Sequence, residues 1–112
     1  MRTIPTRWAL PLAVASALAM PAAPPPALAA PQTHTIVIER MHFGPVPANL
    51  RTGDTIVWVN RDIFRHTATA RDRSFNVDLA PGARGRTVLR RNGAILFYCI
   101  FHPGMTGRLA VR

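Results

Sequence analysis

The chain has 112 residues, which is enough for one domain, and its formal net charge is +9. All 14 basic residues are Arg, and a single Cys excludes a disulfide within the chain. A charge of this size is typical of proteins that bind nucleic acid, membranes or acidic partners, and the N-terminal segment helps to decide among these classes.

The first 29 residues have the composition of a secretory signal peptide. Arg2 and Arg7 give a positive start, an apolar run follows at residues 8–20, and Ala27-Leu28-Ala29 forms an A-x-A cleavage pattern. The apolar run contains Pro11 and is too short for a membrane span of ~20 residues. We therefore predict export, most simply to the periplasm, without stable membrane insertion; an uncleaved N-terminal anchor is the alternative. The signal peptide covers residues 1–29 and the mature domain residues 30–112.

Export argues against nucleic acid as a partner and favours an acidic protein. Removal of the signal peptide leaves twelve Arg against five acidic residues, a net charge of about +7. The plainer interpretation is that many of these Arg side chains simply keep strand faces in water.

The mature domain shows the pattern of short β-strands separated by Gly, Pro and Asn turns. No segment combines a helical period with capping residues, and no internal repeat is present. The pattern predicts an all-β sandwich with about seven strands. In chain order they cover residues 35–39, 55–60, 65–70, 75–79, 86–90, 95–99 and 107–112.

Alternation within the strands predicts which side chains point inward. Residues 41–50 are expected to be irregular, because Gly44, Pro45 and Pro47 bar a helix. Asn92-Gly93 is the strongest short hairpin signal in the chain. Three strands each have a set of residues that shares one face: Ile36 and Ile38; Ile56, Trp58 and Asn60; and Ile95, Phe97 and Cys99, the last on the inner face. In the last strand, Leu109 and Val111 are expected to point inward.

The segment Phe97–Gly107 gathers the residues with the most distinctive chemistry. It holds the only cysteine, with Cys99, His102 and Met105 in a Cys-x2-His-x2-Met spacing. Thiolate, imidazole and thioether are ligands that copper selects, and His66 supplies a further candidate upstream. One Cys, two His and a weak axial Met are the ligand set of a blue-copper electron-transfer site.

Each candidate ligand also has a plainer interpretation. Cys99 alone would be a small buried hydrophobe, Met105 would be core filler, and an isolated His66 would be a surface residue. Their joint spacing favours ligation over these alternatives. His34 and His42 match no ligand position, and both are expected at the surface.

Phe97–Gly107 resembles the copper-binding loop of the cupredoxins, and its short spacing is most similar to that of amicyanin and plastocyanin-like members. The run Gly53–Asp62, which leads to His66, resembles the segment that brings the first His ligand in the same family. The resemblance implies a Greek-key β-sandwich of seven to eight short strands. It also implies one type 1 copper ion bound by His66, Cys99, His102 and Met105.

The chain departs from the cupredoxin pattern beside two of these ligands. The family often has Asn after the first His and Thr or Ser after the Cys, where this chain has Thr67 and Ile100. In the family, those two side chains help to tie the ligand segments together. Thr67 and Ile100 cannot make that side-chain bond, so the departure concerns the rigidity and the reduction potential of the site more than copper binding itself.

The resemblance further implies where electrons enter and leave. In cupredoxins the C-terminal His ligand shows an edge within an apolar patch, which here would comprise Phe101, His102, Pro103 and Gly104. The redox partner would be a protein with an acidic face, such as a c-type cytochrome or a dehydrogenase.

We therefore expect a monomeric electron carrier that is not an enzyme, because four protein ligands leave no open position for a substrate. Copper delivery or copper tolerance is the alternative function. A binuclear copper domain would need a second Cys in the loop, and multicopper oxidases are excluded by length.

Overall fold

Eight short strands make up the folded part of the chain. The computed structural model describes residues 1–25 and 29–112. Each of the seven expected strands is present, with ends that differ by at most two residues from the prediction. The strands are β1 (Thr33–Glu39), β2 (His42–Phe43), β3 (Thr55–Asn60), β4 (His66–Ala70), β5 (Asn76–Leu79), β6 (Arg84–Val88), β7 (Gly93–Tyr98) and β8 (Thr106–Val111).

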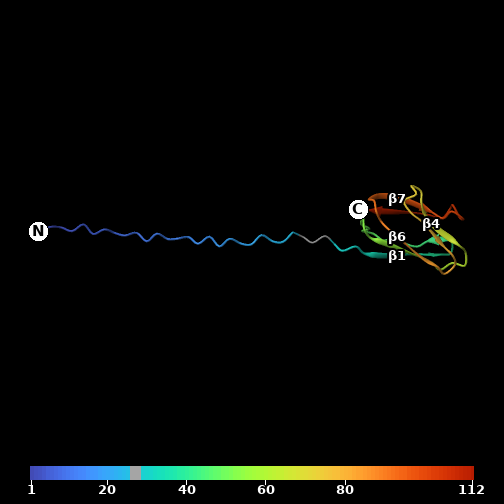
Figure 1. Ribbon diagram of the computed structural model, residues 1–112, viewed down its shortest axis with the longest axis horizontal. Coiled ribbons are helices and arrows are strands. Elements are labelled where there is room, and N and C mark those ends of the chain that lie inside the picture. The colour runs from blue at the N-terminus through green and yellow to red at the C-terminus, as the bar shows by residue number, and fades with distance from the viewer. Residues whose placement is uncertain (26–28) are drawn as a thin grey trace.

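The strands form two four-stranded sheets that face each other (Figure 1). One sheet has the order β2-β1-β3-β6 and the other has the order β5-β4-β7-β8. β1 and β3 run parallel, whereas every other pair of neighbours is antiparallel. The predicted all-β sandwich is confirmed.

The core lies between the sheets, and alternation places its residues. In the β1–β3 pair, Ile36 lies opposite Trp58 and Ile38 lies opposite Asn60, and all four side chains are fully buried. Phe97 enters from the other sheet, and its ring meets the Trp58 ring edge-on with 5.2 Å between centroids. The ten residues that alternation groups on shared faces are all buried, so the predicted alternation is confirmed.

Asn92-Gly93 does not form the predicted hairpin. β6 and β7 lie in different sheets, and residues 89–92 cross from one sheet to the other. The backbone of Leu89 pairs instead with a turn at residues 53–54: its N–H donates to the Asp54 carbonyl at 2.8 Å, and its carbonyl accepts the Gly53 N–H at 2.7 Å. These bonds continue the first sheet past β6, so the chain cannot fold straight back.

Residues 41–50 are less irregular than expected, because they contain β2. β2 joins β1 through a two-residue turn in which Arg40 and Met41 have positive φ angles of 52° and 63°. Hairpin turns of this kind usually use Asn-Gly, since these residues adopt positive φ readily. Arg-Met carries no such signal, which explains why the sequence did not reveal the strand.

The N-terminal segment has no regular structure in residues 1–25, and Figure 1 shows it extended away from the sandwich. Among the described residues, no helix has the length and apolar character needed to cross a membrane. The predicted cleavage pattern includes Ala27 and Leu28, which lie outside the described residues. The signal peptide and its boundary therefore stay predictions.

Gly107 lies where a side chain would collide with the core. A Cβ atom added there would be 2.2 Å from Cζ of the fully buried Phe97 ring. We expect Gly107→Ala to lower the free energy of unfolding by about 1–3 kcal/mol, because Phe97 would have to shift within a packed core. Urea unfolding measures this loss.

Gly104 provides the matched control, because it lies three residues earlier, in the loop before β8, and a Cβ added there meets no atom within 4 Å. Gly104→Ala should change the free energy of unfolding by less than about 0.5 kcal/mol. Equal stabilities of the two variants would contradict the close approach of Gly107 to Phe97.

Candidate metal centre

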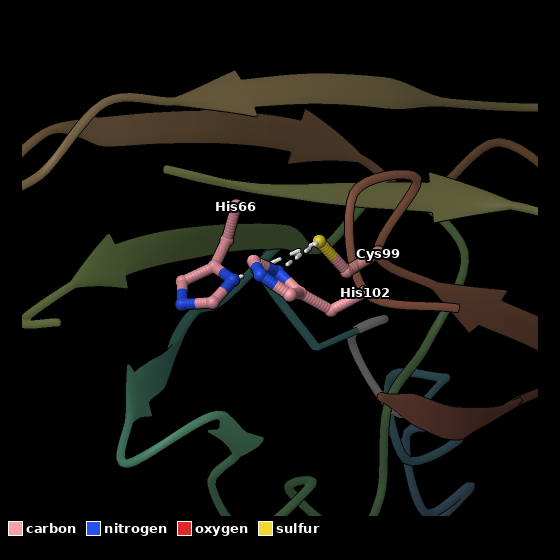
Figure 2. Close-up of side chains that lie close together, drawn as sticks. All are labelled: His66, Cys99 and His102. Atoms are coloured by element: carbon pink, nitrogen blue, oxygen red, sulfur yellow. Dashed lines mark hydrogen bonds between the residues drawn. The ribbon is translucent and has the colours of Figure 1, made fainter. Parts of the chain in front are cut away.

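Three of the predicted ligands meet at one end of the sandwich (Figure 2). His66 Nδ1 lies 3.7 Å from Cys99 Sγ, and His102 Nδ1 lies 3.8 Å from the same sulfur. The three ligand atoms all lie within 4.8 Å of one another. An ion centred among atoms spaced in this way would be roughly 2.2–2.4 Å from each, close to ordinary metal–thiolate and metal–imidazole bond lengths. The cluster therefore fits a single metal ion.

Adjacent strand ends bring these residues together. His66 is the first residue of β4, and Cys99 directly follows β7, the antiparallel neighbour of β4. The loop from β7 to β8 carries His102 and Met105. Its backbone is closed by two hydrogen bonds, from Cys99 N–H to the Met105 carbonyl at 3.1 Å and from Met105 N–H to the His102 carbonyl at 2.8 Å. The loop thus presents its ligands from one tight turn.

Asp62, which the sequence analysis did not single out, orients the His66 ring. Its Oδ2 lies 2.9 Å from His66 Nε2 and accepts the Met41 N–H at 3.0 Å. In a neutral ring whose Nε2 donates to the carboxylate, Nδ1 carries no proton, and Nδ1 is the nitrogen that faces Cys99. Metal-binding imidazoles are commonly oriented by a carboxylate in this way. Hydrogen bonds from His66 and then from the Met41 and Ile63 amides lower the pKa of Asp62 from its ordinary value.

Asn60 fixes the loop that carries Asp62. Its buried NH2 group donates to the carbonyls of Phe64 at 2.8 Å and Leu79 at 3.0 Å, and its Oδ1 accepts the Asp62 N–H at 2.9 Å. Residues 61–65 are therefore attached to the end of β3 and to β5. Asn60 and Asp62 precede the predicted ligand His66 by six and four residues. An amide in a strand and an acidic residue this close to a ligand were the signals that could have identified both.

The two ligand segments are joined at Thr67 and Ile100, although no bond forms between the two side chains. The Thr67 N–H donates to Cys99 Sγ at 3.3 Å, and the Thr67 hydroxyl accepts the Ile100 N–H at 2.9 Å. The sequence comparison concerned side chains alone, and a backbone group replaces one of them here. Ile100 contributes its backbone amide, so a bond from side chain to backbone does the joining.

Met105 is buried among the core residues, with 6% of its surface exposed. Its backbone bonds place it at the base of the ligand loop. Burial is compatible both with an axial ligand and with core filling, so the role of its thioether stays a prediction.

Substitution of Met105 distinguishes these roles. Met105→Leu keeps a similar volume and should cost less than about 1.5 kcal/mol of stability. If the thioether is axial, its loss destabilises Cu(II) more than Cu(I), so the reduction potential rises, whereas Met105→Gln lowers it by supplying an oxygen donor. Voltammetry and melting temperatures of both variants provide the measurement. A potential that is equal in all three proteins would remove Met105 from the site.

His34 is not a surface residue, which corrects the sequence prediction. Its side chain is 16% exposed, and its Nε2 lies 2.9 Å from Asp54 Oδ2. Asp54 also accepts the N–H groups of Gln32 and Arg51, and these bonds together with His34 lower the pKa of Asp54. The pair secures the start of β1 and is not part of the metal cluster. His42 is exposed, as predicted.

His102 is the one member of the cluster that reaches the surface. His66 and Cys99 are fully buried, whereas His102 is half-buried, and Phe101, Pro103 and Gly104 beside it are exposed. The Phe64 ring meets the His102 ring with 6.2 Å between centroids. Phe64 and Ile63 are 49% and 80% exposed. The sequence analysis overlooked these two residues, although two large apolar residues in a charged loop beside a ligand are a usable signal.

Known structures support this description of the fold. No family model matches the sequence, and no curated protein sequence matches it. Solved structures of amicyanin do match in three dimensions. A reduced amicyanin mutant gives a TM-score of 0.64 at 17% sequence identity, over 71% of this chain and 82% of that chain. The Cu(I) form of another amicyanin mutant gives 0.63 at 19% identity, over 70% and 80% of the two chains.

A third match, the reduced state of an amicyanin mutant, gives a TM-score of 0.61 at 21% identity, over the same shares of the two chains. At these identities the matches establish the fold. The chain therefore has the cupredoxin fold of amicyanin, and at one end of that fold it carries a His-Cys-His cluster of the kind that forms a type 1 copper site.

Proposed function

We propose that this chain is an exported, mononuclear type 1 copper protein that carries single electrons between redox partners and catalyses no reaction itself. The observation that carries the proposal is the spacing of His66 Nδ1, Cys99 Sγ and His102 Nδ1, which fits one ion in a buried site. Bound copper would supply the one-electron Cu(I)/Cu(II) couple. His66, Cys99 and His102 would hold it, with Met105 as the weak axial ligand.

The protein would hold the ligands in one arrangement in both oxidation states of copper. Asp62 holds the His66 ring, and Thr67 binds both the sulfur of Cys99 and the amide of Ile100. A ligand set held from several sides keeps one geometry, so little reorganisation accompanies each electron. This rigidity favours electron transfer over copper delivery, for which a site must release its metal.

The exposed edge of His102 offers a short path to a docked partner. Ile63, Phe64, Phe101 and Pro103 give the surface around it an apolar character, and we call these four residues the apolar cap. Transient redox complexes commonly use small interfaces of this kind. A c-type cytochrome or a dehydrogenase would bind here to a monomeric carrier.

Charge complementarity favours an acidic face on that partner. All four Asp of the mature domain already have a partner within the chain, namely His34, His66, Arg91 and Arg65 for Asp54, Asp62, Asp72 and Asp78. Among the described residues, Arg65 and Arg91 are the Arg side chains that form an ion pair. The excess positive charge therefore faces outward, where it attracts an acidic protein.

Copper loading tests the function directly. Purified protein with one equivalent of Cu(II) should show an intense visible charge-transfer band and should cycle reversibly between oxidised and reduced forms in voltammetry. A colourless protein that binds only Cu(I) and transfers it to a chelator would instead support copper delivery, the alternative function.

The docking proposal predicts a strong dependence of electron transfer on salt. The Debye length falls from ~30 Å at 0.01 M to ~8 Å at 0.15 M ionic strength, so the bimolecular rate with an acidic c-type cytochrome should fall steeply over that range. An uncharged small-molecule oxidant is the control and should show little change. A flat rate with the cytochrome would leave the apolar cap as the whole interface.

A further inference from the structure

A line of side-chain hydrogen bonds runs from the ligand loop to the edge strand β5. The Ile100 N–H donates to Thr67 Oγ1 at 2.9 Å, Thr67 Oγ1 lies 2.9 Å from Thr69 Oγ1, and Thr69 Oγ1 donates to Asn76 Oδ1 at 2.8 Å. Thr67 and Thr69 share one face of β4, and Asn76 is the register partner of Thr69 on β5. The line thus connects the residue after Cys99 to a strand that carries no ligand.

The donor direction of this line is fixed at every step. Thr69 donates its one hydroxyl proton to Asn76 Oδ1, so in its contact with Thr67 the Thr69 oxygen must be the acceptor. The Thr67 hydroxyl must therefore donate to Thr69, which leaves its lone pairs for the Ile100 N–H. The acceptor that holds the ligand loop is oriented by Thr69, and Thr69 is oriented by Asn76.

These hydroxyls are shielded from water although they lie on the outer face of their sheet. Thr67 is 3% exposed and Thr69 is 8% exposed, while Ala68 and Ala70 on the opposite face belong to the core. Water therefore offers no easy replacement for a lost partner, and a buried hydroxyl without one is costly. Each member of the line consequently depends on the next.

We propose that Thr69 and Asn76 are positioning residues of the metal centre, which act through the Thr67 hydroxyl to hold Ile100 and thereby Cys99. Thr67 holds Cys99 through two hydrogen bonds. Its N–H donates to Cys99 Sγ, and its hydroxyl accepts the N–H of Ile100, which follows Cys99. Loosening the hydroxyl contact lets the loop move relative to β4 and weakens the N–H bond to the sulfur. In this chain, the Thr-x-Thr pair of β4 and Asn76 therefore connect the ligand loop to β4 and β5.

The redox consequence of this proposal rests on the proposed copper function. A hydrogen bond to the Cys99 sulfur withdraws charge from it and favours Cu(I), so weakening that bond lowers the reduction potential. The structural consequence, a looser ligand loop, is independent of copper and is measurable in metal-free protein.

Amide hydrogen exchange of the metal-free protein, followed by NMR, tests the structural consequence. In Thr69→Val, which keeps the shape of the side chain and removes its hydroxyl, we expect the Ile100 amide to exchange about two- to tenfold faster, the range that loss of one neutral hydrogen bond gives. Thr69→Ser restores the hydroxyl and should restore slow exchange. Asn76→Ala, at an exposed edge position, should give a change in the same direction without threatening the fold.

Thr87→Val is the matched control. Thr87 is also a buried Thr, but its hydroxyl accepts the Trp58 indole N–H in the other sheet. Its substitution should destabilise the sandwich without a specific effect on Ile100. Copper-loaded Thr69→Val should show a lower reduction potential than the wild type, and copper-loaded Thr87→Val should not.

Unchanged Ile100 exchange in both Thr69→Val and Asn76→Ala would overturn the proposal, as would an equal effect of Thr87→Val. Faster Ile100 exchange in a protein that never shows the copper charge-transfer band would support the positioning role and refute the proposed function. The positioning role of Thr69 and Asn76 and the proposed copper function can therefore be refuted independently.

Discussion

Cys99→Ser is expected to abolish the intense visible band of the copper-loaded protein while the sandwich stays folded. The band arises from charge transfer out of the thiolate, and an alcohol at this position neither ionises at neutral pH nor binds copper as a soft ligand. Serine is close in size to cysteine, and its oxygen can accept the Thr67 N–H that now binds Sγ. Cys99 is fully buried, and Cys99→Ser therefore changes the chemistry of this position more than its packing.

Absorption during Cu(II) titration and circular dichroism of the same samples measure the two halves of this prediction. His42→Gln is the control, because His42 is exposed and stands apart from the cluster. That variant should keep the full colour. Survival of the band in Cys99→Ser would mean that the ligand assignment is wrong.

Local sequence patterns were sufficient to predict seven of the eight strands and ten of the buried positions. Alternation placed residues such as Ile36, Trp58 and Phe97 inside, because a strand with one face against the core must repeat every two residues. The Cys-x2-His-x2-Met spacing likewise predicted a compact ligand loop, since ligands three residues apart within one short turn have little freedom to separate. His66 was brought to the same place by the pairing of β4 with β7.

The same local patterns could not predict interactions between segments that lie far apart in the sequence. The prediction of a hairpin at Asn92-Gly93 was wrong because Leu89 pairs with residues 53–54, about 35 positions away in sequence. The sequence predicts a surface position for His34, because nothing local reveals its bond to Asp54. The joining of Thr67 to Ile100 uses a backbone amide, which every residue except proline supplies, so residue identity at position 100 could not predict it.

Asp62 shows most clearly how such a contact acts on the site. Its Oδ2 accepts both the His66 Nε2–H and the Met41 N–H, and the loop that carries it is fixed by Asn60. The carboxylate selects the tautomer of His66 in which Nδ1 is free to bind a metal. Without it, the ring can rotate and can carry its proton on Nδ1, the nitrogen that faces Cys99.

Asp62→Ala should therefore weaken copper binding by about 10–100-fold, the usual effect of removing a carboxylate that orients a metal-binding imidazole. Asp62→Asn keeps an oxygen acceptor for His66 and should lose less affinity. Competition with a chelator of known affinity measures both variants. Asp72→Ala is the charge-matched control, because Asp72 pairs with Arg91 and lies beyond the end of β4 opposite to His66. If net charge alone set the affinity, Asp72→Ala would weaken copper binding as much as Asp62→Ala does. If the hydrogen bond to His66 sets it, only the Asp62 variants change, and Asp62→Asn lies between the wild type and Asp62→Ala.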